Sequence, residues 1–259
     1  MIKISGLVIT YNSASILSDC LAAMSTVCEE IVVVDSFSSD NTREICSSFS
    51  KVLFVQQEWL GFGTQKNFGA SLAKHDHILS VDSDEVLSEN LICEINRLKE
   101  KNEMPPVVWF NRLNNYYGKF LKHGLESRDH KPRLYNKKLA EWNNSPVHEK
   151  LVTERSYPKY LLEGDLFHYT IPNISEHLKK INEYSSLDAG RLFQNEKKFS
   201  VFKLFFSPFM AFIKAYFLKS GFRDGGTGLI VALMHANARF LRYAKLWENR
   251  KLLSPQKVT

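Results

Sequence analysis

The stretch HILSVDSDE, residues 77–85, decides how the rest of the chain is interpreted. His77–Val81 is a short apolar run that predicts a buried β-strand, and Asp82 and Asp84 follow it directly. Side chains two positions apart leave an extended chain on the same face, so both carboxylates can point into one small volume. Two like charges held that close repel each other unless a cation binds or one carboxyl is protonated. The stretch therefore predicts a site for a divalent cation, Mg²⁺ or Mn²⁺, at the end of this strand.

The same residues also admit other interpretations. Ser83 or Asp84 could be the N-cap of the helix expected from Ser88, in which case the acidic turn needs no metal. Paired aspartates also act as nucleophiles in some phosphatases. There, however, they usually follow the first strand of the core, whereas here they follow the fourth.

Apolar strands alternate with amphipathic helices over the first 110 residues. This pattern is typical of an α/β fold whose mostly parallel, doubly wound sheet has helices on both faces. Between residues 111 and 170 the apolar residues no longer follow helical spacing, and this spacing returns near Asn173. The predicted strands cover residues 4–9, 31–34, 52–55, 77–81 and 107–110. The predicted helices cover residues 13–27, 39/40–49, 64–74, 88–101 and 173–195.

Polar residues follow three of the predicted strands. Thr10-Tyr11-Asn12 follows the first strand, Asp35 follows the second, and Asp82 with Asp84 follows the fourth. The carboxyl ends of parallel strands meet at one edge of a sheet, where α/β folds bind nucleotides. There, Asp35 could accept a hydrogen bond from a nucleobase N–H or a ribose hydroxyl.

A glycine-containing segment, GFGTQKN at residues 61–67, precedes a predicted helix. Its glycines permit an unusual turn or a close approach of the backbone. The N-terminus of the helix can face a phosphate, and Lys66 adds a positive charge one turn in. The spacing is not that of a dinucleotide-binding fingerprint, because the third glycine is missing.

These segments together resemble the inverting family 2 glycosyltransferases of GT-A fold, and most closely the bacterial lipopolysaccharide-core β-1,4-glucosyltransferase group. The resemblance runs nearly end to end. It is carried by VVDSFSSD (33–40), GFGTQKN (61–67), DSDE (82–85), RDHKPRL (128–134), PVHE (146–149), GDLFHY (164–169) and GFRDG (221–225).

The resemblance implies a metal-dependent hexosyltransferase that moves a hexose, glucose in the nearest group, from a UDP-sugar such as UDP-glucose. The acceptor would be a lipid-linked saccharide such as the lipopolysaccharide core. Residues 1–195 would form the catalytic domain, with a nucleotide-sugar half (1–110) and an acceptor-side half (111–170). Residues 196–259 would form a basic, aromatic extension that associates with the membrane or the acceptor.

The resemblance also assigns roles to single residues. The nucleotide-sugar-binding residues that it implies are Thr10, Tyr11, Asn12, Asp35, Lys66, Asp82 and Ser83. Asp84 would bind the metal directly. His148 would be a further metal ligand or, alternatively, a structural imidazole. Inversion requires a general base for the acceptor hydroxyl, and Asp129 and Glu149 are the two candidates.

The positive charge of the chain is concentrated at its C-terminal end. The net charge is +6, but residues 197–259 hold 12 basic and 2 acidic residues, whereas residues 1–196 hold 22 basic and 26 acidic residues. Such a segment favours an anionic partner: membrane lipid, a phosphorylated glycolipid or nucleic acid. Because no nucleic-acid-binding motif is found, we expect no nucleic-acid partner. The alternative to an enzyme is a non-catalytic lipid- or nucleic-acid-binding protein that uses this basic region.

Lys197–Arg223 combines six basic residues with nine aromatic ones and holds no acidic residue. Its longest uncharged run, Leu204–Ile213, is ten residues long and contains Pro208, whereas a spanning helix needs about 20. We therefore expect an amphipathic helix at an anionic membrane surface, or one that packs on the catalytic domain. The corresponding localisation is the cytoplasm, peripheral on the inner face of the bacterial inner membrane.

The cysteines and the N-terminus agree with that localisation. Cys20, Cys46 and Cys93 fall within predicted helices, so we expect reduced core thiols in a reducing cytoplasm. Met1–Ile4 leads straight into a strand, so we expect no signal peptide.

Overall fold

The structure is a computed structural model that describes residues 1–145 and 149–253. The chain divides into two compact units. The first unit comprises Met1–Leu113 and Asp129–Tyr169, and the second comprises Asn114–Arg128 and the chain from Thr170 onward. The helix that was predicted over residues 173–195 thus lies in the second unit, although it was expected within the catalytic domain.

The central sheet has the strand order β3-β2-β1-β4-β8-β6-β11-β5. The strands β3, β2, β1 and β4 pair in parallel, while β8 pairs antiparallel with β4 and β5 pairs antiparallel with β11. This confirms the α/β class and the mostly parallel sheet over the nucleotide-sugar half. The strands are β1 (Ile4–Thr10), β2 (Glu30–Asp35), β3 (Val52–Gln56), β4 (His77–Asp82), β5 (Glu85–Leu87), β6 (Val107–Tyr116), β8 (Arg128–Asn136) and β11 (Tyr160–Ile171). A smaller sheet pairs β9 (Ala140–Trp142) with β10 (Leu151–Thr153).

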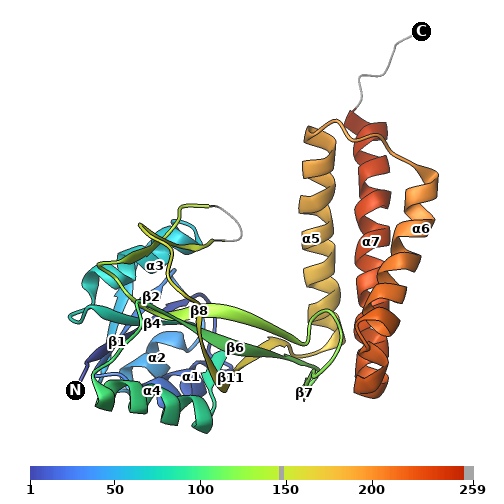
Figure 1. Ribbon diagram of the computed structural model, residues 1–259. Helices are drawn as coiled ribbons and strands as arrows, with labels where there is room; N and C mark the ends of the chain where they lie inside the picture. Colours follow the sequence, from blue (N-terminus) through green and yellow to red (C-terminus); the bar gives the residue numbers. More distant parts are fainter. Residues whose placement is uncertain (146–148, 254–259) are drawn as a thin grey trace. The chain divides into compact units, whose positions relative to one another are not determined.

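Helices cover both faces of the parallel half, as Figure 1 shows. Side chains alternate between the faces along each strand. In β2, Ile31 and Val33 join the core beneath α1 (Leu17–Ser25), α2 (Thr42–Ser47) and α4 (Glu89–Lys101). Val32 and Val34 join the core beneath α3 (Phe62–Leu72). Because both faces are covered, these strands are apolar at nearly every position, which is the pattern that predicted them.

Two expectations about the region after β4 need correction. The helix α4 has Ser88 as its N-cap, whose hydroxyl accepts a hydrogen bond from the Leu91 amide at 3.3 Å. Neither Ser83 nor Asp84 is therefore an N-cap, because the short strand β5 separates them from the helix. In addition, the extended backbone ends at Asp82, so the argument that Asp82 and Asp84 share a face does not apply.

The cysteines follow the expectation except at one position. All four are free, and Cys20, Cys28 and Cys46 are buried, where burial raises the pKa of the thiols, to about 11 for Cys46. Cys93 is exposed on α4. The prediction of a core thiol is wrong at Cys93, because the buried face of α4 is formed by Leu91, Ile95 and Leu98 instead.

The second unit is mainly helical. It contains α5 (Ile174–Gln194), α6 (Val201–Ile213), a π-helical turn (Lys214–Leu218), a 3-10 turn (Gly221–Asp224) and α7 (Gly225–Leu253). The helix α7 packs against both α5 and α6 (Figure 1). The short strand β7 (Lys119–Phe120) pairs with the end of β6 in the same unit. Asn173 caps α5 by accepting from the Glu176 amide at 2.9 Å, which confirms the helix predicted over residues 173–195.

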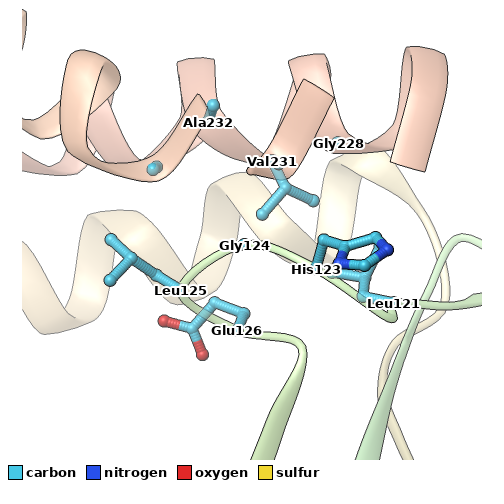
Figure 2. Close-up of a pocket in the computed structure, with 10 residues that line it drawn as sticks. Leu121, His123, Gly124, Leu125, Glu126, Gly228, Val231 and Ala232 are labelled. Atoms are coloured by element: carbon cyan, nitrogen blue, oxygen red, sulfur yellow. The ribbon is translucent and has the colours of Figure 1, made fainter. Parts of the chain in front are cut away.

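The GFRDG segment forms a tight turn that holds a loop of the second unit. The Asp224 carboxylate accepts hydrogen bonds from the backbone amides of Lys122 at 3.3 Å and His123 at 2.8 Å. A Cβ at Gly228 would lie 1.9 Å from the Gly221 carbonyl oxygen, so only glycine fits there. Between this loop and α7 lies a small hollow of about 10 Å³ (Figure 2). Ligand pockets are usually about 300–1,000 Å³, so this hollow does not suit a nucleotide sugar.

The helical conformation continues past Pro208 from α6 into the π-helical turn. Val201–Leu218 forms a segment of 18 residues that is, by length and composition alone, apolar enough to cross a membrane, and 6% of it is buried. The uncharged run is still Leu204–Ile213, as expected, but the apolar helical segment that contains it is longer. Pro208 does not end the helix, and the segment tolerates Lys203 and Lys214 within it.

Candidate active site

The ends of three parallel strands bring most of the predicted residues to one edge of the sheet. β1 lies between β2 and β4, with Thr10 opposite Asp35 in one pairing and Ile9 opposite Asp82 in the other. The carboxyl ends of the strands therefore meet, as the order of polar residues along the sequence predicted.

Two buried polar side chains, Thr10 and Asp35, lie at the carboxyl ends of β1 and β2. The Asp35 carboxylate, 1% exposed, accepts hydrogen bonds from the Ser38 amide at 3.0 Å and the Gln56 side chain at 3.2 Å, and also from the Ser38 hydroxyl. Thr10 is 5% exposed, and its Oγ1 has no hydrogen-bond partner within residues 1–145 and 149–253. A buried hydroxyl without a partner is costly in a folded protein. The Thr10 hydroxyl is therefore a buried, unsatisfied polar group at this strand end, opposite Asp35.

Asn12, Tyr11 and Ser83 lie in the loops that follow the strands. Asn12 has a left-handed backbone with φ 50° and accepts a hydrogen bond from the Ser39 amide at 2.8 Å, which ties two loops together. Tyr11 is 63% exposed. The Ser83 hydroxyl lies 2.9 Å from the Ser13 hydroxyl. Asn12 and Ser83 thus shape the loops, and the Tyr11 ring is free to contact a ligand.

The glycine-containing segment has the unusual turn and the close backbone approach that were predicted, but the helix begins at Phe62, within the segment and earlier than expected. Gly61 has φ 94° and precedes α3, and a Cβ at Gly63 would lie 1.9 Å from the Asn143 carbonyl oxygen. Lys66, one turn into α3, is 1% exposed, and its ammonium lies 4.6 Å from the centre of the Trp142 ring. The lysine is therefore held inside the protein, close to the strand ends.

Asp82 lies between two buried cations. Its Oδ1 is 3.0 Å from Lys66 Nζ, and its Oδ2 pairs with Arg133, which is 3% exposed. Burial alone would raise the pKa of Asp82, but Arg133 and Lys66 outweigh it and hold that pKa well below the usual range. Asp82 is therefore ionised and already neutralised by protein cations, which makes it a poor direct ligand for a metal.

The ion pairs continue from Asp82 in two directions. Lys66 also contacts Glu149 Oε1 at 2.9 Å. On the other side, Arg133 pairs with Glu85, and Arg112 links Glu85 at 3.2 Å to Asp129 at 2.8 Å. Charges of alternating sign thus form one continuous chain. We call this chain the ionic network, and its members in order are Asp129, Arg112, Glu85, Arg133, Asp82, Lys66 and Glu149.

Both candidate bases are ends of the ionic network. Asp129 receives two hydrogen bonds of 2.8 Å from Arg112 and a contact of 3.2 Å from Lys131. Burial would raise the pKa of Asp129, but Arg112 and Lys131 lower it overall. Within residues 1–145 and 149–253, Glu149 forms one ion pair, with Lys66. The two carboxylates therefore differ in how tightly the protein holds them.

Asp84 has a different environment from Asp82. Its side chain is 40% exposed, and its Oδ2 lies 3.2 Å from His168 Nε2 on β11. A carboxylate and an imidazole together are a donor pair that suits Mn²⁺ and related ions. No cluster of three potential metal ligands occurs within residues 1–145 and 149–253, and His148 lies outside these residues.

Four residues of this site were not predicted from the sequence to have a functional role. Glu85 and Arg133 stood inside recognised segments, so their neighbourhood was signalled although their roles were not. His168 lies in the GDLFHY segment, but no role was assigned to it. Arg112, inside β6, carries no local signal, because only the tertiary fold brings it to Glu85.

Comparisons with known proteins find glycosyltransferases among the relatives of this chain. The chain is 34% identical over 257 residues to an uncharacterised glycosyltransferase of Rickettsia typhi (strain ATCC VR-144 / Wilmington), covering 96% of this chain and 88% of the relative. It is 28% identical over 262 residues to the lipopolysaccharide core biosynthesis glycosyltransferase LpsC of Rhizobium meliloti (strain 1021), covering 97% and 94%. Among solved structures, S. aureus TarS 1–349 in complex with UDP is 16% identical, with 96% of this chain and 92% of that chain covered and a TM-score of 0.47.

The family itself follows from the sequence model of "Glycosyl transferase family 2", which matches residues 5–164. This match spans more than half of the chain and holds the parallel strands, the strand ends and the whole ionic network. The chain belongs to glycosyl transferase family 2.

Proposed function

We propose that this chain is an inverting hexosyltransferase that moves a hexose, glucose in the first instance, from a UDP-sugar to a lipid-linked saccharide such as the lipopolysaccharide core. The observation that supports this proposal most strongly is that Thr10, Asp35, Asp82 and Asp84 follow neighbouring strands at one edge of the sheet. The chain is also a member of glycosyl transferase family 2. The 28% identity to a lipopolysaccharide core biosynthesis glycosyltransferase supports the acceptor class. Family membership also argues against a purely non-catalytic binding protein.

The nucleotide would bind where β1 and β2 end. The unpartnered Thr10 hydroxyl and the Asp35 carboxylate face this end, and the exposed Tyr11 ring offers a surface on which a base can stack. Asn12 and Ser83 would hold the surrounding loops through their contacts with Ser39 and Ser13. Ligands of open α/β sheets bind at the carboxyl ends of the strands, which supports this placement.

A divalent cation would be held by Asp84 and His168. The exposed Asp84 carboxylate and the imidazole beside it fit such an ion, since Mg²⁺ and Mn²⁺ commonly take one or two protein ligands and complete their shell with water and substrate phosphates. His148 remains a proposed further ligand. When bound, the cation supplies charge neutralisation for a diphosphate leaving group. Lys66 and Arg133 hold Asp82 ionised beside this position and fix the field around it.

The acceptor hydroxyl would lose its proton to Asp129 or Glu149. A base with a lowered pKa accepts a proton less readily, so the Arg112 and Lys131 contacts disfavour Asp129. The two proposals are separated by comparing Asp129→Asn with Glu149→Gln. Loss of transfer to an acceptor, with donor hydrolysis retained, identifies the base.

We place the reaction on the cytoplasmic side of the bacterial inner membrane, with the enzyme bound peripherally. A lipid-linked acceptor resides in a bilayer, and the basic C-terminal segment complements an anionic membrane surface.

The test is a donor screen that measures nucleotide release from UDP-glucose, UDP-galactose, UDP-N-acetylglucosamine and GDP-mannose, each with Mn²⁺ or with EDTA. We expect turnover with one UDP-sugar and Mn²⁺, and its loss in EDTA. Asp84→Asn should lower kcat by about 10²–10³ because it removes a ligand of the charge-neutralising ion. Asp76→Asn, which changes an exposed carboxylate paired with Lys138, is the matched control and should leave turnover unchanged. Full turnover of Asp84→Asn would refute the proposed metal role, and turnover of GDP-mannose alone would refute the donor class.

A further inference from the structure

We propose that the second unit binds the surface of an anionic lipid bilayer through one defined face of α6 and the turn that follows it, lying in the plane of the membrane without crossing it. We call this surface the phenylalanine face; its members are Phe202, Phe205, Phe206, Phe209, Phe217 and Leu218. The inference deepens the proposed function, because it names the surface through which the enzyme would reach a lipid-linked acceptor.

The phenylalanine face is unusually exposed for a surface of this composition. Its five phenylalanines are 47–69% exposed, and Leu218 is 71% exposed. At roughly 200 Å² per phenylalanine side chain, the exposed aromatic area is on the order of 600 Å². The largest apolar patch of a soluble monomer is about 300–600 Å² and is often functional. Two of these rings, Phe202 and Phe206, also stack on each other with their centres 4.8 Å apart.

The charges around this face indicate which partner covers it. Exposed basic side chains flank the rings at Lys203, Lys214, Lys219 and Arg223, and no acidic residue occurs from Lys197 to Arg223. Anionic headgroups complement such a border, and each lysine or arginine near an anionic bilayer strengthens binding. A second copy of the chain would instead bring the same positive border against itself, because a two-fold interface pairs like surfaces.

Three features favour lying on the membrane over crossing it. The segment Val201–Leu218 would be at most about 27 Å long as a helix, slightly less than the hydrocarbon core of about 30 Å. Pro208 has no N–H for the Leu204 carbonyl, which water can satisfy at an interface but not in hydrocarbon. Moreover, α7 packs along α6, so crossing would also draw Arg239 and Arg242 of α7 toward the bilayer. An amphipathic helix with basic and aromatic residues at the interface avoids all three costs.

The experiment is co-sedimentation of the full chain with vesicles of phosphatidylethanolamine and phosphatidylglycerol, and with neutral phosphatidylcholine vesicles. We expect binding to the anionic vesicles that weakens as salt is raised. The double variant Phe205→Ser, Phe209→Ser should lower the partition coefficient about 100-fold, because neither position then has an apolar ring to bury in the bilayer. Lys203→Gln with Lys214→Gln should lower it about 30-fold, or about fivefold for each lysine. The matched control is Tyr184→Ser with Leu187→Ser, which removes side chains 63% and 58% exposed on α5, and it should bind like the parent.

Several outcomes would overturn the inference. These are equal binding to neutral vesicles, unchanged binding of the phenylalanine double variant, or an equal loss in the α5 control. A membrane fraction that resists alkaline carbonate extraction would show a spanning helix instead. A concentration-dependent dimer that ignores vesicles would show that the face covers a second copy. Nucleotide release in detergent solution, without vesicles, tests the proposed enzymatic function separately. Failure of that assay with vesicle binding intact removes only the enzymatic proposal, and the reverse result removes only this inference.

Discussion

The two units place their charged and apolar side chains in opposite ways. In the first unit, Lys66, Glu85 and Arg133 are buried and paired, and the apolar residues of the parallel strands lie inside. In the second unit, the phenylalanine face is exposed and no acidic residue occurs in the stretch Lys197–Arg223 that carries it. Buried ions that satisfy one another hold a site in a fixed geometry, whereas an exposed apolar surface requires a partner. The comparison therefore separates the unit that holds the proposed active site from the unit that carries the proposed membrane-binding face.

The largest expected effect concerns the ionic network. Arg133→Met leaves the fully buried Glu85 with Arg112 as its one remaining ion-pair partner among those described here, and leaves Asp82 with Lys66. We expect a loss of about 3–5 kcal/mol in the free energy of unfolding, as is typical when one member of a buried pair is removed. Urea unfolding measures it.

Lys138→Met is the control for that measurement. It removes an exposed ion pair of 2.8 Å with Asp76, which should contribute less than about 1 kcal/mol. If Arg133→Met were as mild as Lys138→Met, the buried charges would not be what holds this site in shape.

The second prediction compares apolar truncations in the two units. Leu21→Ala removes a side chain of α1 that is 0% exposed, and we expect a loss of about 2–5 kcal/mol. Phe205→Ala removes a side chain that is 67% exposed, and we expect a change of less than about 0.5 kcal/mol in solution. Hydrogen exchange of peptides from α1 and α6 measures both. A comparable cost for Phe205→Ala would mean that the phenylalanine face supports the fold rather than a partner.

Most of the fold was predictable because its signals are local. The strands β1, β2 and β4 are apolar at consecutive positions since helices cover both faces of the sheet, and Asn173 marks the start of α5 as a capping residue. The meeting of Thr10, Asp35 and Asp82 followed from the topology of parallel strands alone.

The electrostatics of the site were not predictable in the same way. Asp82 and Asp84 look equivalent in the sequence, yet Asp82 is enclosed by Lys66 and Arg133 while Asp84 lies beside His168. These partners come from α3, β8 and β11, so the distinction arises only when the chain folds. The length of the exposed apolar helix was also missed, because Pro208 was read as an interruption and the structure carries the helix through it.

The third prediction uses the titration of a histidine in the second unit. Burial, together with His235 and Lys180, lowers the pKa of His177 to about 4 in spite of Glu126, and the Tyr117 hydroxyl is hydrogen-bonded to its Nδ1. The unfolded chain, with a pKa near 6.5, binds this proton first as pH falls. The neutral histidine therefore contributes stability that is complete above about pH 6.5 and is lost as pH falls toward 4, by at most about 3 kcal/mol.

His177→Gln should flatten that pH dependence for peptides of α5 and α7, as measured by hydrogen exchange at pH 7.5 and 4.5. His75→Gln, in the first unit, is the control and should leave it unchanged. An identical pH profile in His177→Gln and the parent would assign the acid sensitivity to other groups.

The smallest expected effect tests whether the two units are stabilised independently. Ser88 caps α4 in the first unit and Asn173 caps α5 in the second, through hydrogen bonds of 3.3 Å and 2.9 Å. Replacing either by Ala should cost about 1 kcal/mol, because one amide of the first turn loses its partner. Hydrogen exchange should show the loss in the helix whose cap is changed and leave the other helix protected as before. If Ser88→Ala lowered the protection of α5 as much as that of α4, the units would open as one body, and the contrast between a site-forming unit and an attachment unit would not extend to their stability.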